Sequence, residues 1–363
     1  MPCYFPLQAV RLQDLHPGTG NRRIKVLGSI ARCYDDFLKA NPDIPAKALA
    51  KLLKRWQSVN DAYWSHVDAD DLLQVPCGKC VGCRLERSRQ WAVRCVHEAS
   101  LYDDRNCFIT LTFNDQFLPR DRSLSKSIFQ DFMKRLRKRY VKTVPKHYDD
   151  ASRDKFLFEN GIRYFHCGEY GETYGRPHYH AILFNHVFDD IVLYKRTATG
   201  CDLYTSECLQ RLWSCPETGR PFGFATVGSM TFDSAAYCAR YIMKKVTGEA
   251  AEEHYKGRLP EYTTMSRAPG IAKRWFDQFF TDVYPKDYFK LKKDDKLIEM
   301  RPPRYYDNQF ELLDECEMLA VKEARKLAAA ANVSDNTPER LHSKHKKKLL
   351  DINRLIRNVD AEQ

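Results

Sequence analysis

Two histidines, His178 and His180, stand in a stretch that reads Arg-Pro-His-Tyr-His and continues into an apolar run. Such a run predicts a β-strand, in which side chains at i and i+2 point to the same face. The two imidazoles can therefore converge on one metal ion, while Tyr179 between them faces the other way into the core. A pair of strand histidines that only pack inside the protein is the alternative interpretation.

A carboxylate can complete this metal site. Residues 163–169 also read as a strand that ends at Glu169, and a turn-rich segment, residues 170–177, connects this strand to the histidines. That hairpin would bring Glu169 beside the histidines, with Glu172 as the second choice because it lies closer to the turn. Two imidazoles and one carboxylate leave coordination positions open for a substrate, as metal-ion catalysis requires.

A possible nucleophile lies further along the chain. Residues 234–245 are rich in alanine with few helix breakers, which predicts a helix. Tyr237 and Tyr241 are four positions apart and share one face of that helix, and Lys244 and Lys245 follow one turn later. A tyrosine hydroxyl, with its ordinary pKa of about 10, needs a polarised phosphate and nearby cations to become reactive. The alternative is two aromatic residues on the core face of an amphipathic helix.

Three cysteines, Cys77, Cys80 and Cys83, have a spacing typical of metal ligands, because thiolates three positions apart in a tight knuckle can meet one ion. A structural zinc site needs four ligands, and Cys3 is the preferred fourth. The alternatives for that position are Cys95 and His97. The spacing also suits an iron–sulfur cluster, and three unliganded thiols remain as the simplest interpretation.

A basic amphipathic helix is predicted after an apolar strand, at residues 131–140. Its positive charges are carried by Lys134, Arg135, Arg137, Lys138 and Arg139. Because the segment comes after that strand, we expect it to flank the active site and to contact a DNA backbone, which positions a strand without reading its sequence. A solvated charged face is the alternative.

The composition of the chain independently limits the classes of function. The 363 residues suit one large domain or two smaller ones, and 59 Lys and Arg against 48 Asp and Glu give a net charge of +11. That excess favours a polyanionic partner. No apolar run is long enough to span a membrane, and the N-terminus lacks the pattern of a signal peptide. Thirteen cysteines without such a signal predict reduced thiols in a cytoplasm, some of them bound to metal.

Three consecutive parts are expected along the chain: an N-terminal arm with the cysteine knuckle, residues 1–100; a core that holds the histidines and tyrosines, residues 101–285; and a charged, mostly helical basic tail, residues 286–363. Within the tail, residues 340–350 contain five Lys or Arg and no acidic residue. We expect either a solvated extension or added affinity for phosphates that falls with salt.

Several further strings accompany these motifs. They are residues 107–114, an apolar strand ending in Thr and small polar residues, and residues 76–84, 168–171 and 265–271. Taken in order with the His-Tyr-His motif and the tyrosine pair, they resemble the HUH endonucleases, the superfamily of rolling-circle replication initiators, relaxases and related transposases. More narrowly, the set is similar to the replication initiators of small single-stranded DNA phages of the Microviridae, the gokushovirus branch. The similarity covers residues 76–276.

This resemblance implies an α+β fold, with an HUH-type central antiparallel sheet flanked by helices in two layers, a small zinc-knuckle arm and a helical C-terminal extension. The elements expected within the core are strands at 107–113, 162–168 and 179–185, and helices at 125–140 and 233–246.

The resemblance also implies a function. The chain would initiate rolling-circle replication by nicking and rejoining single-stranded DNA at the phage origin, through a 5′-phosphotyrosine intermediate. Mg²⁺ or Mn²⁺ at the histidines and Zn²⁺ at the cysteines would be the metals, although imidazole pairs also suit Zn or Ni. The expected partners are single-stranded and origin DNA and the host replication helicase and polymerase, in the cytoplasm of a bacterial host and without a membrane. Two alternatives stay open: a noncatalytic DNA-binding or packaging protein, and a metal-dependent nuclease that uses water.

Overall fold

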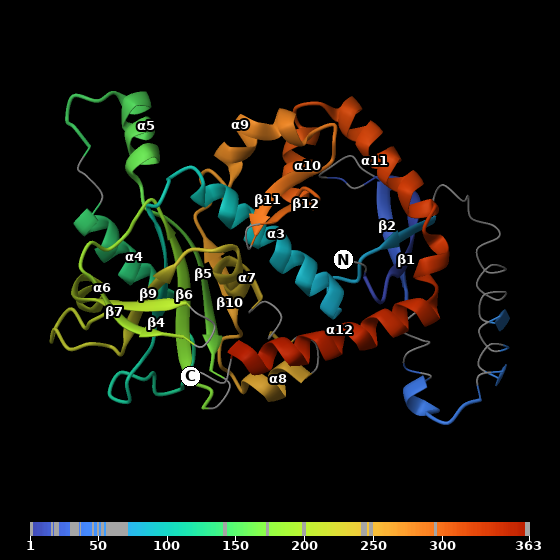
Figure 1. The fold of residues 1–363 in the computed structure, drawn as a ribbon, viewed down its shortest axis with the longest axis horizontal. Coiled ribbons are helices and arrows are strands. Elements are labelled where there is room, and N and C mark those ends of the chain that lie inside the picture. The colour runs from blue at the N-terminus through green and yellow to red at the C-terminus, as the bar shows by residue number, and fades with distance from the viewer. Residues whose placement is uncertain are drawn as a thin grey trace. The chain divides into compact units, whose positions relative to one another are not determined.

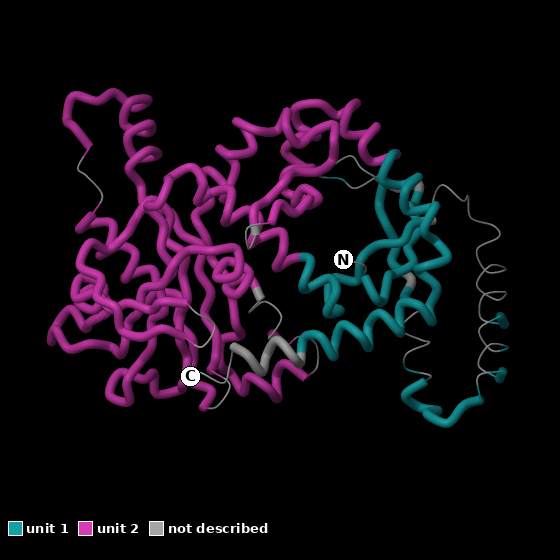
Figure 2. The backbone as a smooth tube through the Cα atoms, viewed as in Figure 1, with its two compact units in different colours: residues 1–86, 324–356 teal, residues 87–323, 357–363 magenta. Residues whose placement is uncertain are grey.

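The computed structural model groups the chain into two compact units, coloured separately in Figure 2: residues 1–86 with 324–356, and residues 87–323 with 357–363. The residues that the structure describes are 3–15, 17, 22–29, 36, 38–45, 47–48, 51, 54–55, 72–140, 144–171, 174–197, 201–240, 245–246, 250–293 and 296–359. The contacts therefore group the chain differently from three consecutive segments, because the C-terminal helix joins the N-terminal arm in one unit.

The larger unit is built on a seven-stranded sheet in which every neighbouring pair of strands is antiparallel (Figure 1). The spatial order of the strands is β10-β5-β6-β4-β9-β8-β7. The strands are β4 (Asn106–Leu111), β5 (Arg163–Tyr170), β6 (Pro177–Phe184), β7 (Ile191–Arg196), β8 (Asp202–Ser206), β9 (Ala225–Ser229) and β10 (Tyr262–Met265). The three expected core strands correspond to β4, β5 and β6, within one or two residues at each end.

Helices and one hairpin complete this unit. The helices are α3 (Val81–Ala99), α4 (Lys126–Tyr140), α5 (Asp150–Asn160), α6 (Glu207–Leu212), α7 (Phe232–Arg240), α8 (Ala250–Tyr255), α9 (Lys273–Val283), α10 (Arg304–Glu311) and α11 (Glu315–Ala330). The hairpin is β11 (Phe289–Lys293) with β12 (Lys296–Met300). Two of these helices, α3 and α11, have one end in the smaller unit by sequence. The expected tyrosine helix corresponds to α7, whose described part ends earlier than predicted.

The central strands are buried on both sides. All eight residues of β6 are buried, as are seven of the eight of β5. A strand covered on both faces needs an almost continuous apolar run, and such a run begins directly after His180. The expected architecture of two layers is therefore wrong in one respect, because helices cover both faces of the sheet.

Alternation along the strands separates the two faces. On one face, Ile182 and Phe184 pack with residues of α3, α7 and α9. On the other face, Ala181 and Leu183 pack with residues of α4 and α6. Because His178 and His180 are an even number of positions from Ile182, they belong to the face that α7 covers.

The smaller unit combines both ends of the chain. Its sheet has the order β2-β1-β3, with β1 (Leu7–Leu15), β2 (Arg22–Gly28) and β3 (Leu72–Val75), and its helical elements are η3 (Val333–Asn336) and α12 (Pro338–Val359). Tyr4 and Phe5 are buried against Leu341 of α12 and lie with their rings 5.3 and 4.9 Å from that of His345. Residues 338–359 of the expected tail are thus helical and their first turns are packed, whereas residues 289–293 and 296–300 form the hairpin of β11 and β12.

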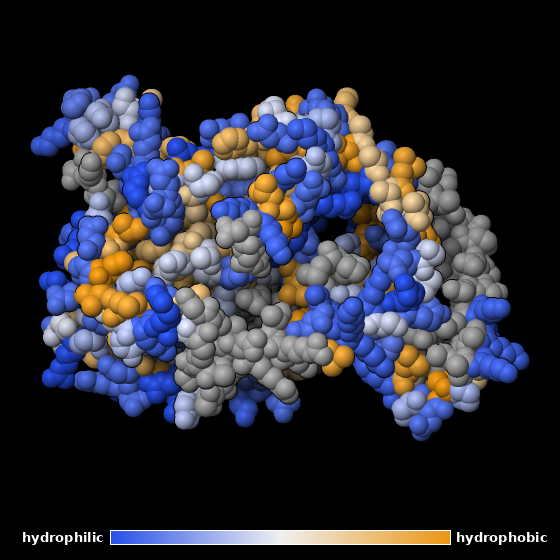
Figure 3. Space-filling view, viewed as in Figure 1, coloured by the Kyte–Doolittle hydropathy of each residue, from blue (hydrophilic) through white to orange (hydrophobic). Residues whose placement is uncertain are grey.

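The surface is largely hydrophilic on the face that Figure 3 shows, including α5 at its upper left, a helix without buried residues. Among the described helices, none has both the length and the apolar character that crossing a bilayer demands.

Candidate active site

The β5–β6 pairing brings three potential metal ligands together. Glu169 is the register partner of His178, and Cys167, two positions before it, is the partner of His180. The Nε2 atoms of His178 and His180 lie 2.6 and 2.9 Å from Oε1 of Glu169, and all three residues are buried. Their ligand atoms lie within 4.8 Å of one another, so the hairpin places these side chains as the sequence predicts.

The protonation of His178 favours a cation at this point. Its Nδ1 lies 3.2 Å from the backbone carbonyl of Arg176, and a carbonyl can only accept a hydrogen bond, so Nδ1 carries a proton. In the neutral ring Nε2 then holds a lone pair directed at a carboxylate oxygen 2.6 Å away. Two lone pairs repel, so a proton or a metal cation has to lie between these atoms. The donor set of two imidazoles and a carboxylate fits a divalent ion.

Thr110 orients the second histidine. It lies on β4 opposite His180, and its Oγ1 is 2.9 Å from Nδ1 of that ring. A partner on the far nitrogen fixes the ring and directs the other nitrogen toward the metal position. The apolar strand at residues 107–114 stood out in the sequence, but this role of Thr110 did not. Which residue of β4 faces His180 depends on a strand register that one sequence does not reveal.

The carboxylate is held in its charged form. Burial, the largest influence on Glu169, raises its pKa, but the hydrogen bonds and charges of His178 and His180 outweigh it and lower the pKa to about 2. The site therefore offers a negative ligand at neutral pH.

The loop between β5 and β6 is closed by its own backbone. The N–H of Gly171 donates to the carbonyl of Arg176 at 2.9 Å, and Gly175 adopts a positive φ of 60°, which favours glycine. The guanidinium of Arg176 donates to Asp115 at 2.5 Å and to the carbonyl of Phe113 at 3.0 Å. These contacts fix the end of the hairpin from which the ligands project.

Tyr237 of α7 lies beside the histidines. Its ring centroid is 5.2 Å from that of His180, with the planes at 83°. The helix begins where Thr231 and Ser234 bond to each other's backbone N–H, an arrangement that satisfies free donors at a helix start. The side chains of Ala235 and Ala239 are fully buried, and their small size lets α7 approach the sheet closely.

Three of the predicted site residues lie outside the described residues: Tyr241, Lys244 and the second-choice carboxylate Glu172. Lys245, the other cation predicted to act with the tyrosines, is described and is half-buried.

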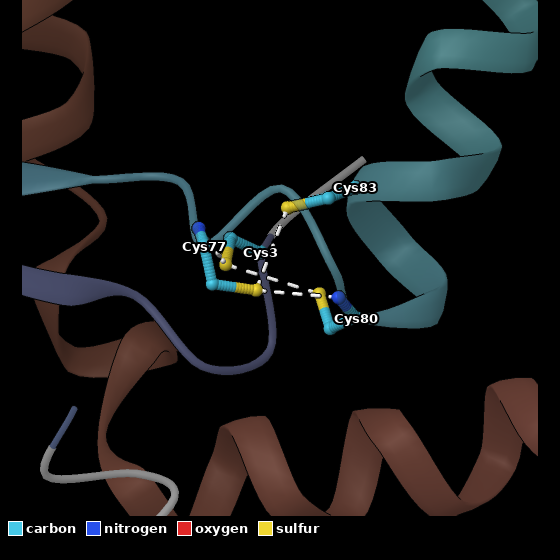
Figure 4. Close-up of side chains that lie close together, drawn as sticks. All are labelled: Cys3, Cys77, Cys80 and Cys83. Atoms are coloured by element: carbon cyan, nitrogen blue, oxygen red, sulfur yellow. Dashed lines mark hydrogen bonds between the residues drawn. The ribbon is translucent and has the colours of Figure 1, made fainter. Parts of the chain in front are cut away.

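The four predicted cysteines form a second cluster, shown in Figure 4. Their sulfur atoms all lie within 4.8 Å of one another, with Sγ of Cys3 3.8 Å from that of Cys80 and Sγ of Cys77 4.0 Å from that of Cys83. The preferred fourth ligand, Cys3, is therefore in place. The alternatives, Cys95 and His97, both lie on α3 and are buried within the larger unit instead.

Backbone N–H groups point at these sulfurs. Those of Cys77, Cys80 and Tyr4 lie 3.2 to 3.4 Å from the Sγ atoms of Cys3, Cys77 and Cys80 respectively. Hydrogen bonds from the Cys3 and Cys83 side chains, and from the backbone of Cys83 and Tyr4, lower the pKa of Cys80 far below its ordinary value, although burial opposes this. Four clustered sulfurs, of which that of Cys80 has thiolate character, suit a structural Zn²⁺.

We expected the basic helix α4 to flank the histidines. It instead covers the opposite face of the sheet. Its apolar residues Phe129 and Phe132 pack there, in the same core as Tyr179. The reason is the connection after β4, which returns the chain to the other face.

Several cations of α4 also have contacts within the protein. Arg135 donates to the carbonyl of Leu212, Arg137 donates to the carbonyl of Ile162, and Lys134 pairs with Asp131. Arg139 contacts Cys208.

The chain matches a family model described as replication-associated protein ORF2/G2P over residues 106–246. That range includes β4, the two strands that carry Glu169, His178 and His180, and all of α7.

Individual relatives carry the same description. The chain is 30% identical to replication-associated protein ORF2 of Spiroplasma virus 4, over 76% of this chain and 83% of the relative. It is 33% identical to replication-associated protein VP4 of Bdellovibrio phage phiMH2K, over 65% of this chain and 67% of the relative. It is 30% identical to replication-associated protein ORF4 of Chlamydia phage 1, over 64% of this chain and 54% of the relative. No solved structure matches the chain significantly.

Proposed function

The chain belongs to the family of phage replication-associated proteins, and we propose that it initiates replication by cutting and rejoining single-stranded DNA through tyrosine transesterification. The observation that carries this proposal is the convergence of Glu169, His178 and His180 beside the ring of Tyr237. A metal centre of three protein ligands next to a tyrosine supplies both an electrophile-activating site and a nucleophile.

Each of these residues has a defined task. Glu169, His178 and His180 would hold Mg²⁺ or Mn²⁺, which when bound supplies a Lewis acid for a phosphate oxygen. Glu169 also balances the positive charge of the site, and Thr110 keeps the ring of His180 in position. The hydroxyl of Tyr237, or of Tyr241 four positions further along the chain, is the nucleophile.

The reaction conserves the number of phosphate ester bonds. The tyrosine oxygen loses its proton and forms a bond to the scissile phosphorus, while the bond from phosphorus to the 3′ oxygen of the preceding nucleotide breaks. That oxygen takes up a proton, so the products are a 5′-phosphotyrosine and a free 3′-OH. A host polymerase would extend the 3′-OH, and attack of a 3′-OH on the phosphotyrosine would later rejoin the strand.

Two tyrosines allow the protein to alternate between roles. One would hold the DNA end while the other cuts the next copy, which the four-residue spacing in the sequence would allow if both hydroxyls reach the same phosphate. Lys244 and Lys245, a few positions later in the sequence, would stabilise the charge that develops on the phosphate.

The cysteine cluster would bind Zn²⁺ as a structural ion. Four sulfurs leave no open position for a substrate, so this site has no place in the chemistry. It instead ties the N-terminal segment at Cys3 to the knuckle of Cys77, Cys80 and Cys83.

One assay separates the three classes of function. We would incubate the protein and Mn²⁺ with labelled single-stranded oligonucleotides tiled across the genome that carries its gene, and boil the products before a denaturing gel. Transesterification predicts a labelled protein adduct, which His178→Ala and His180→Ala should lose while DNA binding is retained. Cleavage without an adduct would indicate hydrolysis by water, and binding alone would indicate a noncatalytic protein.

A further inference from the structure

A groove of about 1330 Å³ lies on the larger unit and is lined by α4, α5, the first residues of β5 and the loop after β10. Helix α4 contributes Arg137 and Lys138, and α5 contributes Phe158. Tyr164 of β5 lines it as well, and the loop contributes residues 266–269.

Buried charged side chains hold that loop by its backbone. Arg163 donates to the carbonyl of Pro269 at 2.7 Å and to Oε1 of Glu98 at 2.5 Å. The other oxygen of Glu98 accepts from the N–H of Ala272 at 2.6 Å. Arg94 donates two bonds, of 3.1 and 2.9 Å, to the carbonyl just before Ala272. Burying three charges is unfavourable unless all are paired, so these contacts select one conformation of the loop.

The loop at residues 266–269 places the cation of Arg267 in the wall of the groove. Arg267 lines it and is exposed, whereas the neighbouring backbone is fixed. The string at residues 265–271 stood out in the sequence, yet it contributes no ligand and no nucleophile to the metal centre. Its place in the wall of this groove gives it a task there.

The lining has the chemistry of a site for single-stranded nucleic acid. Arg163 is neutralised by Glu98, so the positive charge comes from Arg137, Lys138 and Arg267, against the single carboxylate of Asp154. The half-buried rings of Phe158 and Tyr164 stand among these cations. Cations that follow a backbone, together with aromatic rings for unpaired bases, are how proteins bind single strands without reading their sequence.

The groove is separate from the metal centre. Tyr164 and Glu169 lie on the same strand but five positions apart, about 17 Å along it, and on opposite faces of the sheet. On that side the described sheet ends at β10, its outer strand, so the two faces meet at this edge. A DNA strand held at both places would therefore extend past this edge.

We propose that the groove binds the backbone of single-stranded DNA at a second site, outside the nucleotides that are cut. The proposal rests on the proposed function, which makes single-stranded DNA the substrate. It predicts that the groove adds affinity for long strands and leaves the chemistry of the nick unchanged.

The test uses the double variant Lys138→Ala/Arg267→Ala, and Arg211→Ala/Lys286→Ala as a control that removes the same charge from exposed positions elsewhere. Fluorescence anisotropy in EDTA would measure the binding of labelled single-stranded oligonucleotides of increasing length at several salt concentrations, without cleavage. The groove variant should bind long strands roughly tenfold more weakly, with a salt slope smaller by about 1.4, as for two lost phosphate contacts. On strands too short to reach the groove it should match the wild type.

Three results would overturn the groove assignment: the same affinity and salt slope as the control, a loss that does not depend on strand length, or an equal loss on duplex DNA. Thermal unfolding at the wild-type temperature would show that the variant is folded. We expect this result because both substituted side chains are exposed. Groove-dependent binding by a protein that forms no adduct with Mn²⁺ would refute the proposed function and support the groove. Adduct formation with normal binding by the groove variant would do the reverse.

Discussion

The hydroxyl of Thr110 is the contact that most sharply separates a metal centre from two packed histidines. It lies 2.9 Å from Nδ1 of His180, on the side of the ring away from Glu169. We expect Thr110→Val, which keeps the shape of the side chain, to weaken Mn²⁺ binding or adduct formation roughly 10- to 100-fold. Titration calorimetry with Mn²⁺ would measure the affinity.

The matched control is Thr226→Val, at the register partner of Thr110 on β9, one strand further from the histidines. It should bind Mn²⁺ as the wild type does. If both valine variants bind and react normally, the orienting role of Thr110 is wrong.

A second residue-scale prediction concerns His97. Burial lowers its pKa from 6.5 to about 3, and its Nδ1 lies 2.8 Å from the hydroxyl of Tyr306. In the unfolded chain His97 therefore binds a proton near pH 6.5, whereas in the folded protein it binds one only near pH 3. Stability attributable to His97 is fully present above pH 6.5 and falls by about 1.4 kcal/mol per pH unit as the pH drops between these values.

Urea unfolding at pH 7 and pH 5.5 would measure this effect. The free energy of unfolding of His97→Gln should fall less between the two pH values than that of the wild type, while His254→Gln, at an exposed histidine, should fall as much. Identical pH dependence of all three proteins would contradict the prediction.

At the residue level the sequence predicted which groups meet, but not how they are held. The spacing of His178 and His180 on a strand, and the hairpin that returns Glu169, can be inferred from alternation and turn residues alone. The carbonyl of Arg176 and the hydroxyl of Thr110 could not be predicted, because they depend on tertiary register and loop geometry.

Among the elements, the cysteine knuckle makes the strongest claim. Its three thiols and that of Cys3 offer a complete zinc site, and zinc binding of this kind is coupled to folding. We expect purified protein to contain about one tightly held zinc per chain, and Cys80→Ala to lose it and unfold at a lower temperature. Cys316→Ala, at an exposed cysteine, should keep the metal and the stability. Elemental analysis that finds iron and sulfide, or no metal, would refute the assignment.

The faces of the elements were harder to predict than their type. The apolar stripe of α4 correctly predicted an amphipathic helix, and Phe129 and Phe132 are indeed buried. Which side of the sheet it covers depends on how the chain leaves β4, and nothing in the spacing of apolar residues records that choice. The basic residues were consequently expected beside the histidines, whereas Arg137 and Lys138 line a groove on the far side.

For the whole molecule, the joining of the two ends of the chain in one unit has a testable consequence. Leu341 of α12 is 3% exposed and packs with Tyr4, Phe5 and Cys80. Leu341→Ala should therefore destabilise this unit by roughly 2–4 kcal/mol and speed the release of zinc to a chelator. Leu350→Ala, at a leucine that is 62% exposed, should do neither. Equal behaviour of the two variants would mean that the tail is only a solvated extension.

Composition alone could not have predicted that arrangement. The Lys-rich sequence of residues 340–350 predicts a helix with a polar surface, and only the partner residues near the N-terminus explain the burial of Leu341. Contacts between segments more than 300 residues apart leave no periodic signal in either segment.

The central claim is that a tyrosine of the pair Tyr237 and Tyr241 attacks the phosphate, and identification of the DNA-linked residue tests it most directly. After reaction with Mn²⁺ and a cleavable single-stranded oligonucleotide, nuclease and protease digestion would leave one peptide with a nucleotide attached, which mass spectrometry can sequence. We predict that the modified residue is Tyr237 or Tyr241, that Tyr237→Phe and Tyr241→Phe each still form one adduct, and that the double variant forms none. A nucleotide on any other residue, or an adduct formed by the double variant, would contradict the account.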